Sequence, residues 1–135
     1  MRGTRAIILT LALAGIAVGL GAQAPAFKRT VVQQGDLASI PGREAVTAVV
    51  DFEPGAAIAR HTHPGEEVGF VVEGTLAVEQ DGKPAETVTA GHAFLIPAGT
   101  IHKATNSGKV ATKVLSTYVV EKGKPLATFV PAPAK

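Results

Sequence analysis

The chain has 135 residues, a net charge of +2 and no cysteine. A chain of this length is expected to form a single domain, and without cysteine it must close on an apolar core rather than on disulfides. Aromatic residues are few and no basic stripe runs along the sequence. We therefore expect no nucleic-acid partner.

The N-terminus has the layout of a secretory signal peptide. Arg2 and Arg5 form a short positive region, and an uncharged run of small and apolar residues follows over 6–20. That run is short for a transmembrane span. Small residues then allow cleavage after Ala24 or after Ala26, and both sites stay open. We expect a periplasmic or secreted protein with no membrane segment in its mature form; an uncleaved N-terminal anchor is the alternative.

Removal of the signal peptide changes the charge of the protein. Arg2 and Arg5 leave with it, so the 13 basic residues of the chain fall to 11, which equals the number of acidic residues. The net charge of the mature chain is then about zero. This balance gives the protein no electrostatic reason to bind a polyanion.

The rest of the chain has the periodicity of short β-strands and almost no helix signal. Apolar and polar residues alternate over 46–52 and over 75–79, as they do in strands with one buried face. A first edge strand is expected over 27–34, and a β-rich run over 110–120 predicts a central strand or one that reaches a partner chain. Glycine and proline turn signals separate these segments. The pattern predicts an all-β sandwich or barrel.

The expected organisation is simple. A signal peptide over 1–26 precedes one folded domain over 27–125, and no internal repeat of useful length divides that domain. The segment 126–135 is rich in proline and alanine, and we expect it to be an extended tail with little structure of its own.

Two sequence motifs that begin with glycine hold three of the four histidines at fixed positions. The first motif reads G-x5-H-x-H-x3-E-x6-G over 55–74, and the second reads G-x5-P-x-G-x2-H-x3-N over 91–106. Imidazole and carboxylate groups are ligands that divalent transition metals accept, and no thiolate competes with them here. The candidate metal ligands are His61, His63, Glu67 and His102.

Spacing indicates how these side chains meet. His61 and His63 are two residues apart, so on a strand they leave the same face and can bind one ion together. Glu67 enters the next strand, whereas Glu66 is expected on the opposite face. His102 approaches from another strand. Four such donors leave one or two coordination positions open for a small-molecule substrate or ligand.

Other residues of the motifs have structural explanations. His92 has no partner at metal-ligand spacing, and we expect an exposed turn residue. A local turn hydrogen bond explains Asn106 as well as a ligand contact does. Gly69 has the same parity as Glu67 and offers no side chain that blocks the metal. The motif glycines are expected to take turn conformations that a side chain resists. Candidate wall residues, which are also plain core candidates, are Phe52, Phe94 and Tyr118.

Together the two motifs resemble the paired motifs of the cupin superfamily. The resemblance covers 55–106, and the interval of 16 residues between the motifs is similar to that of small single-domain bacterial cupins. It implies a double-stranded β-helix, also called a jelly-roll barrel, which often forms a homodimer. It also implies that His61, His63, Glu67 and His102 hold the metal.

The resemblance leaves the function open, because one fold carries many reactions. The donor set suits Fe, Mn, Ni, Cu, Co or Zn. Our first hypothesis is an exported metal-dependent, dioxygenase-like oxidoreductase that acts on a small oxygen-chelating compound, with Glu67 as ligand or as general base. The alternatives are a periplasmic module that binds or senses a metal or small ligand without turnover, and a metal-dependent isomerase or lyase.

Overall fold

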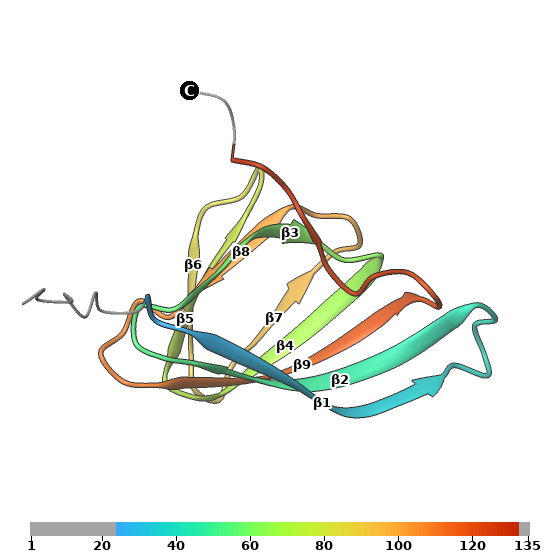
Figure 1. Ribbon diagram of the computed structural model, residues 1–135, viewed down its shortest axis with the longest axis horizontal. Coiled ribbons are helices and arrows are strands. Elements are labelled where there is room, and N and C mark those ends of the chain that lie inside the picture. The colour runs from blue at the N-terminus through green and yellow to red at the C-terminus, as the bar shows by residue number, and fades with distance from the viewer. Residues whose placement is uncertain (1–23, 133–135) are drawn as a thin grey trace, which may run out of the picture.

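The computed structural model describes residues 24–132. Within this range the chain forms ten strands and no helix, and the strands make two antiparallel sheets that face each other (Figure 1). No helix in the described range is long and apolar enough to cross a membrane. The predicted all-β jelly roll is confirmed. Residues 1–23, which hold most of the expected signal peptide, lie outside the described residues.

The first sheet has the order β1-β2-β9-β4-β7. The β-rich run predicted near the C-terminus forms its central strand, and the predicted first edge strand pairs only with its neighbour. Figure 1 shows β1 and β2 extending past the second sheet. The strands are β1 (Phe27–Asp36), β2 (Arg43–Phe52), β9 (Thr112–Glu121), β4 (Gly65–Glu73) and β7 (Ala93–Ile96).

The second sheet has the order β10-β3-β8-β5-β6 and lies across the interior from the first. Its strands are shorter, and its β3–β8 pair changes register between Ile58 and His61. They are β10 (Thr128–Phe129), β3 (Ala57–Thr62), β8 (His102–Thr105), β5 (Thr75–Gln80) and β6 (Glu86–Thr89).

The interior between the sheets contains two apolar clusters. Alternation along β2 and β9 turns every second side chain inward, as the period of two requires. The large apolar cluster contains Val50, Phe52, Ala56, Val71, Leu76, Val78, Val88, Phe94, Ile96, Ala104 and Val114. The small apolar cluster contains Val46, Ala48, Tyr118 and Val120.

Along β9 a buried polar residue lies between the two clusters. On β9 the inward residues run from Val114 of the large cluster through Ser116 to Tyr118 of the small cluster. Buried polar residues also come from β3, β4 and β8. We call this group the polar layer; its members are His61, His63, Glu67, His102 and Ser116.

The segment after β9 differs from the expected tail. Residues 126–130 are extended, but they lie against the second sheet rather than apart from the domain. Leu126 packs against the small apolar cluster, and β10 pairs with β3 at Thr62 and His61. The backbone N–H of Val130 donates to the carbonyl of Arg60. The edge of β3 explains this, because its unpaired backbone groups accept another extended segment.

The glycine turns of the first motif have the expected conformation. Gly74 joins β4 to β5 with a φ of +79°, and a Cβ atom there would lie 2.5 Å from Thr112 Oγ1. Any side chain at this position would therefore strain the backbone and collide with β9. Positive φ angles also occur at the three other motif glycines predicted to need them, Gly55, Gly91 and Gly99.

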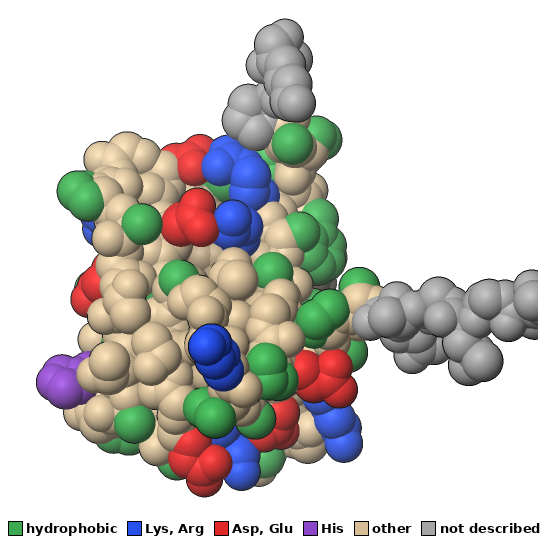
Figure 2. All heavy atoms as spheres, turned by 90° about the vertical axis from the view of Figure 1, so that its left-hand side faces the viewer, with side chains coloured by type: hydrophobic (Ala, Val, Ile, Leu, Met, Phe, Trp, Pro, Cys, Tyr) green, Lys and Arg blue, Asp and Glu red, His purple; other side chains and the backbone are tan. Residues whose placement is uncertain are grey.

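The outer surface carries charges of both signs. Figure 2 shows acidic and basic side chains interspersed on the face that it presents. Lys103 pairs with Glu79 across β8 and β5 at 3.0 Å, and Arg60 makes two hydrogen bonds to Asp81 of 2.6 and 2.7 Å. Exposed pairs of this kind contribute little to stability, so the packing of the interior carries the fold.

Candidate metal centre

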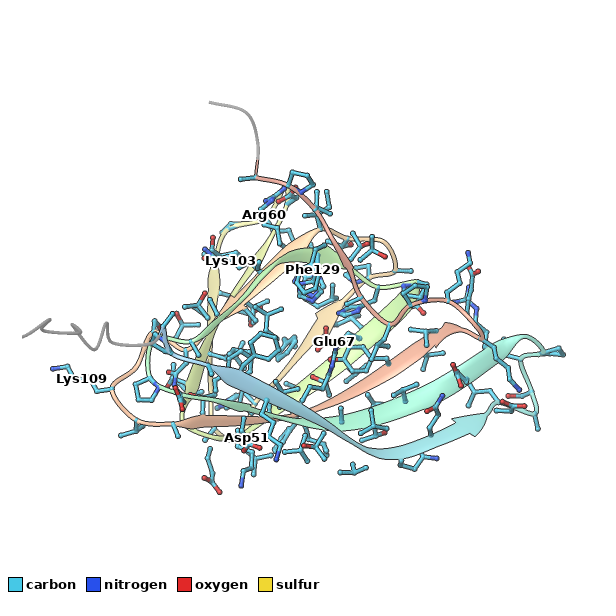
Figure 3. The ribbon with its side chains drawn as sticks, viewed as in Figure 1. Asp51, Arg60, Glu67, Lys103, Lys109 and Phe129 are labelled. Atoms are coloured by element: carbon cyan, nitrogen blue, oxygen red, sulfur yellow. The ribbon has the colours of Figure 1, made fainter. Side chains whose placement is uncertain are left out.

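The structure brings the four predicted ligand side chains together in the polar layer. His61 lies near the end of β3, His63 follows that strand, Glu67 lies on β4 and His102 begins β8. All four side chains are buried. One ring nitrogen from each histidine lies within 4.8 Å of those of the other two, and Figure 3 shows Glu67 in the space between the sheets.

Backbone carbonyls set the orientation of all three imidazole rings. A carbonyl oxygen can only accept a hydrogen bond, so each Nδ1 carries the proton. In the neutral ring this leaves the Nε2 lone pair free for a metal, which is the usual arrangement of histidine ligands. The pairs are His61 with Ala59 at 2.7 Å, His63 with Leu126 at 2.5 Å and His102 with Thr100 at 2.9 Å.

The Nε2 atoms of His63 and His102 face the Glu67 carboxylate. Its Oε2 atom lies 3.0 Å from His63 Nε2 and 3.4 Å from His102 Nε2. Its other oxygen, Oε1, accepts a hydrogen bond of 2.7 Å from the Ser116 hydroxyl. His63 Nε2 is buried and forms no hydrogen bond with the described residues. Lone pairs and a carboxylate oxygen thus converge, which is an arrangement that a cation stabilises.

Burial and neighbouring groups shift the pKa values of this cluster. Burial lowers the pKa of His61 to about 4, against a partial offset from the Ala59 carbonyl, so the ring is neutral near pH 7. Burial alone would raise the pKa of Glu67. Contacts with His102, His63 and Ser116 outweigh that effect and hold the pKa well below its usual range. The site therefore presents a neutral imidazole and an ionised carboxylate, which are the forms that bind metals.

A pocket opens beside the cluster. Its cavity volume is about 20 Å³, within about 380 Å³ of space that includes open solvent, and His61, Glu67 and His102 form part of its wall. Most of the remaining wall is apolar, and the predicted wall residues Phe52, Phe94 and Tyr118 all contribute to it. A largely apolar pocket with a few convergent polar groups is the usual form of a small-molecule site.

Tyr118 and Phe129 frame the histidines. The Tyr118 ring centre lies 4.8 Å from that of His63, and burial together with the charge of Glu67 raises the pKa of Tyr118, so its phenol keeps its proton. The ring centre of Phe129 lies 5.9 Å from that of His61, and Figure 3 shows Phe129 beside the second sheet. The C-terminal segment thus contributes both a ring and the Leu126 carbonyl to the surroundings of the cluster.

The motif residues that were assigned no chemistry lie outside the cluster. Glu66 is exposed on the outer face of β4, as strand alternation predicts. His92 is exposed, and its Nδ1 lies 3.2 Å from Thr89 Oγ1 in a local turn. Asn106 is fully buried but structural, because its amide donates to the carbonyls of Phe52, Glu53 and Val110.

Gly69 was expected to leave the metal position unobstructed, but the space beside it is filled by another side chain. It points inward, but a Cβ atom there would lie 2.1 Å from Phe94 Cζ. The missing side chain therefore makes room for the Phe94 ring, which lines the pocket, rather than for open space at the metal position.

Three contributors were not identified from the sequence. Ser116 had a weak signal, since it is a polar residue at an inward position of an otherwise apolar stretch of β9. The Leu126 carbonyl had none, because any residue supplies a carbonyl. Arg29 lines the pocket from β1, and its position depends on how that strand pairs with β2.

Comparison with known families decides the classification. The sequence profile of the family described as "Cupin domain" matches residues 48–118, which include all four candidate ligands. The chain belongs to this cupin family. The family match and the cluster of three histidines together indicate a metal-binding cupin.

The relatives of this cupin include plant proteins. It is 32% identical over 113 residues to oxalate oxidase 2 of Hordeum vulgare, and this match covers 76% of this chain and 50% of that protein. It is 32% identical over 97 residues to germin-like protein subfamily 2 member 2 of Arabidopsis thaliana, covering 66% of this chain and 44% of that protein. The cupin chain thus spans about half the length of the curated relatives it matches.

A solved structure of a recombinant oxalate oxidase in complex with glycolate has the same fold. Its TM-score is 0.59 at 28% sequence identity, and the match covers 78% of this cupin and 55% of that chain. The likeness therefore extends from the motifs to most of the two-sheet framework that positions them.

Proposed function

We propose that this cupin is an exported, metal-dependent oxidoreductase that acts on a small oxygen-chelating organic compound. His61, His63, Glu67 and His102 hold one divalent transition metal, which is Fe, Mn, Ni, Cu, Co or Zn. The observation that carries the proposal is the convergence of three imidazoles and an ionised carboxylate at the wall of a mostly apolar pocket.

The donor set fits such an ion. When the rings are neutral, the carbonyl contacts at Nδ1 leave lone pairs at the Nε2 atoms, and those of His63 and His102 face a carboxylate oxygen at 3.0 and 3.4 Å. Without a positive charge between them these acceptors would repel one another. A bound metal ion would supply this charge, together with open coordination positions for substrate oxygens and, if redox-active, a path for electrons to O2.

The residues around the metal position have separate tasks in the proposal. Glu67 would help to hold the metal, and its carboxylate, which is ionised near neutral pH, would accept a substrate hydroxyl proton. Ser116 holds Oε1 in place while this happens. Phe52 and Phe94 keep bulk water away from the reacting atoms.

The named relatives suggest the first compounds to test. One relative is an oxalate oxidase, and a solved oxalate oxidase holds glycolate. Both compounds are small and can chelate a metal through two oxygens. Oxidation of glycolate to glyoxylate would release two electrons and two protons, which O2 would take up as hydrogen peroxide.

The experiment measures O2 consumption and peroxide release by protein loaded with each metal in turn. Substrates are oxalate, glycolate and a panel of enolic and phenolic compounds, with metal-free protein and His102→Ala as controls. Metal-dependent O2 uptake supports the proposal. Product formation without O2 uptake would instead identify an isomerase or lyase, and specific binding without any product would identify a binding module.

Two further parts of the proposal concern location and assembly. We propose that the chain is exported and that its mature form is a homodimer. The N-terminal layout supports export, and the test is the N-terminal residue of protein from the cell envelope, expected to be Pro25 or Phe27. Retention of Met1 in that fraction would contradict cleavage.

An exposed apolar surface supports the dimer. Phe70 pairs with Leu115 and Val68 with Leu95 on the outer face of the first sheet, where all four are exposed large hydrophobic side chains. Singly exposed apolar residues are common, but a contiguous group of this kind favours an interface. The test is the mass in solution, which is expected to fall to that of the monomer in Phe70→Glu. A monomeric wild-type protein would contradict the dimer.

A further inference from the structure

Arg29 is a cationic side chain of the pocket wall to which the proposed function assigns no role. It lies on β1 opposite Val50, a buried residue of β2 that also lines the pocket. Although exposed, the Arg29 side chain forms part of the same pocket wall as His61 and Glu67. A guanidinium group therefore borders the cavity into which the metal position opens.

The guanidinium of Arg29 takes part in no ion pair within residues 24–132. The pocket wall contains one acidic residue, Glu67, whose two oxygens already face Ser116 and the histidines. The positive charge of Arg29 is thus available to a molecule that enters the pocket.

A second hydrogen-bond donor lies next to it. Tyr118 lines the same pocket close enough to Arg29 for the two side chains to interact, and its hydroxyl is a hydrogen-bond donor. A guanidinium and a hydroxyl that both donate match a carboxylate, which only accepts, and arginine binds carboxylates with charge-assisted hydrogen bonds.

We infer that Arg29 is a specificity-determining residue that selects substrates carrying a carboxylate. The inference rests on the proposed function and names its substrate class: small organic acids whose carboxylate pairs with Arg29 while other oxygens reach the metal position. The pocket favours such anions further, because a divalent cation and Arg29 together outweigh the single charge of Glu67.

The test measures binding rather than turnover. Dissociation constants are determined by calorimetry for metal-loaded protein with glycolate, oxalate and lactate, and with glycolamide, oxamide and lactamide as uncharged counterparts. Arg29→Gln is expected to weaken binding of the acids roughly 10-fold or more and to leave the amides unchanged, with metal content unaltered. Arg29→Lys should retain part of the preference.

Lys28→Gln is the matched control, because it removes the same charge from the same strand at a residue outside this pocket. It should leave the affinities of the acids unchanged. Equal losses for acids and amides in Arg29→Gln would overturn the inference, as would a wild-type protein that prefers none of the acids to its amide. A preference that depends on Arg29 without O2 consumption would sustain the inference and reject the proposed oxidoreductase activity.

Discussion

The large apolar cluster and the polar layer share the inward faces of β4, β8 and β9, yet they have opposite chemistry. On β9 Val114 belongs to the cluster and Ser116 to the layer, and on β8 Ala104 and His102 differ in the same way. A step of two residues along one strand thus leads from the apolar cluster to the polar layer. The comparison shows that strand alternation fixes which side chains meet, whereas residue type alone decides what the meeting point does.

The two regions should also differ in what stabilises them. The cluster gains free energy from removal of apolar surface from water, with or without a metal. The polar layer costs desolvation energy, which its carbonyl and hydroxyl partners offset only in part. The stability contributed by the layer should therefore depend on the bound ion.

Removal of a histidine ligand should have the largest effect on the polar layer. We expect His61→Ala or His102→Ala to lose almost all bound metal, because too few donors remain to hold the ion. Metal should then no longer raise Tm, since that rise requires binding to the folded state. Elemental analysis and thermal unfolding with and without metal measure both effects.

His92→Ala is the control, because His92 is exposed and far from metal-ligand spacing. It should keep the metal content of the wild type. Full metal content in both ligand variants would show that these side chains do not hold the ion.

Truncation of a cluster residue should have the opposite signature. Leu76 is fully buried in the large cluster, so Leu76→Ala leaves a cavity and should lower the free energy of unfolding by about 2–5 kcal/mol. The folded fraction should still bind one equivalent of metal. Urea denaturation and elemental analysis test the two statements, with truncation of the exposed Ile40 to alanine as the control, because Ile40 lies outside both the core and the proposed dimer surface. A loss of metal from folded Leu76→Ala protein would mean that the two regions are not separable.

Adjacent carboxylates on β4 give a smaller and sharper contrast. Glu67→Gln removes the charge that faces His63 and His102 and should weaken metal affinity by roughly 10-fold, the scale expected for altered coordination. Glu66→Gln makes the same chemical change on the outer face and should have almost no effect. Metal titration of both variants tests this contrast. A larger loss of affinity in Glu66→Gln than in Glu67→Gln would mean that Glu66, rather than Glu67, faces the metal position.

Acid should produce the smallest effect. The pKa of His61 is lowered to about 4 in the folded state from an ordinary 6.5, so below pH 6.5 the unfolded chain takes up a proton that the folded chain refuses. Stability of metal-free protein should therefore fall between pH 6.5 and 4, by several degrees in Tm. His61→Ala should show a shallower fall over this range. An identical pH dependence in wild type and variant would contradict the assignment.

Local spacing predicted the parts of the site that neighbouring residues determine. The common face of His61 and His63, the choice of Glu67 over Glu66, and the turn position of His92 all follow from a period of two and from the turn signals. Alternation likewise predicted the inward residues of β2 and the central position of β9.

Contacts between distant segments were beyond such reasoning. Ser116 meets Glu67 across 49 residues of sequence, and the Leu126 carbonyl meets His63 across 63. Both depend on which strands pair and on the path of the C-terminal segment, and neither is encoded in short-range spacing. The space opposite Gly69 was misjudged for the same reason, since Phe94 comes from a strand whose pairing with β4 had to be known.

The position of the Leu126 carbonyl in the chain affects the order in which the candidate metal centre assembles. Residues 126–130 leave the ribosome after all four candidate ligands, so a growing chain possesses every donor before it possesses the acceptor that fixes the His63 tautomer. Loading with metal should accordingly follow completion of this segment. A protease or a fused tag that dislodges residues 126–130 would loosen the ion while leaving each ligand intact.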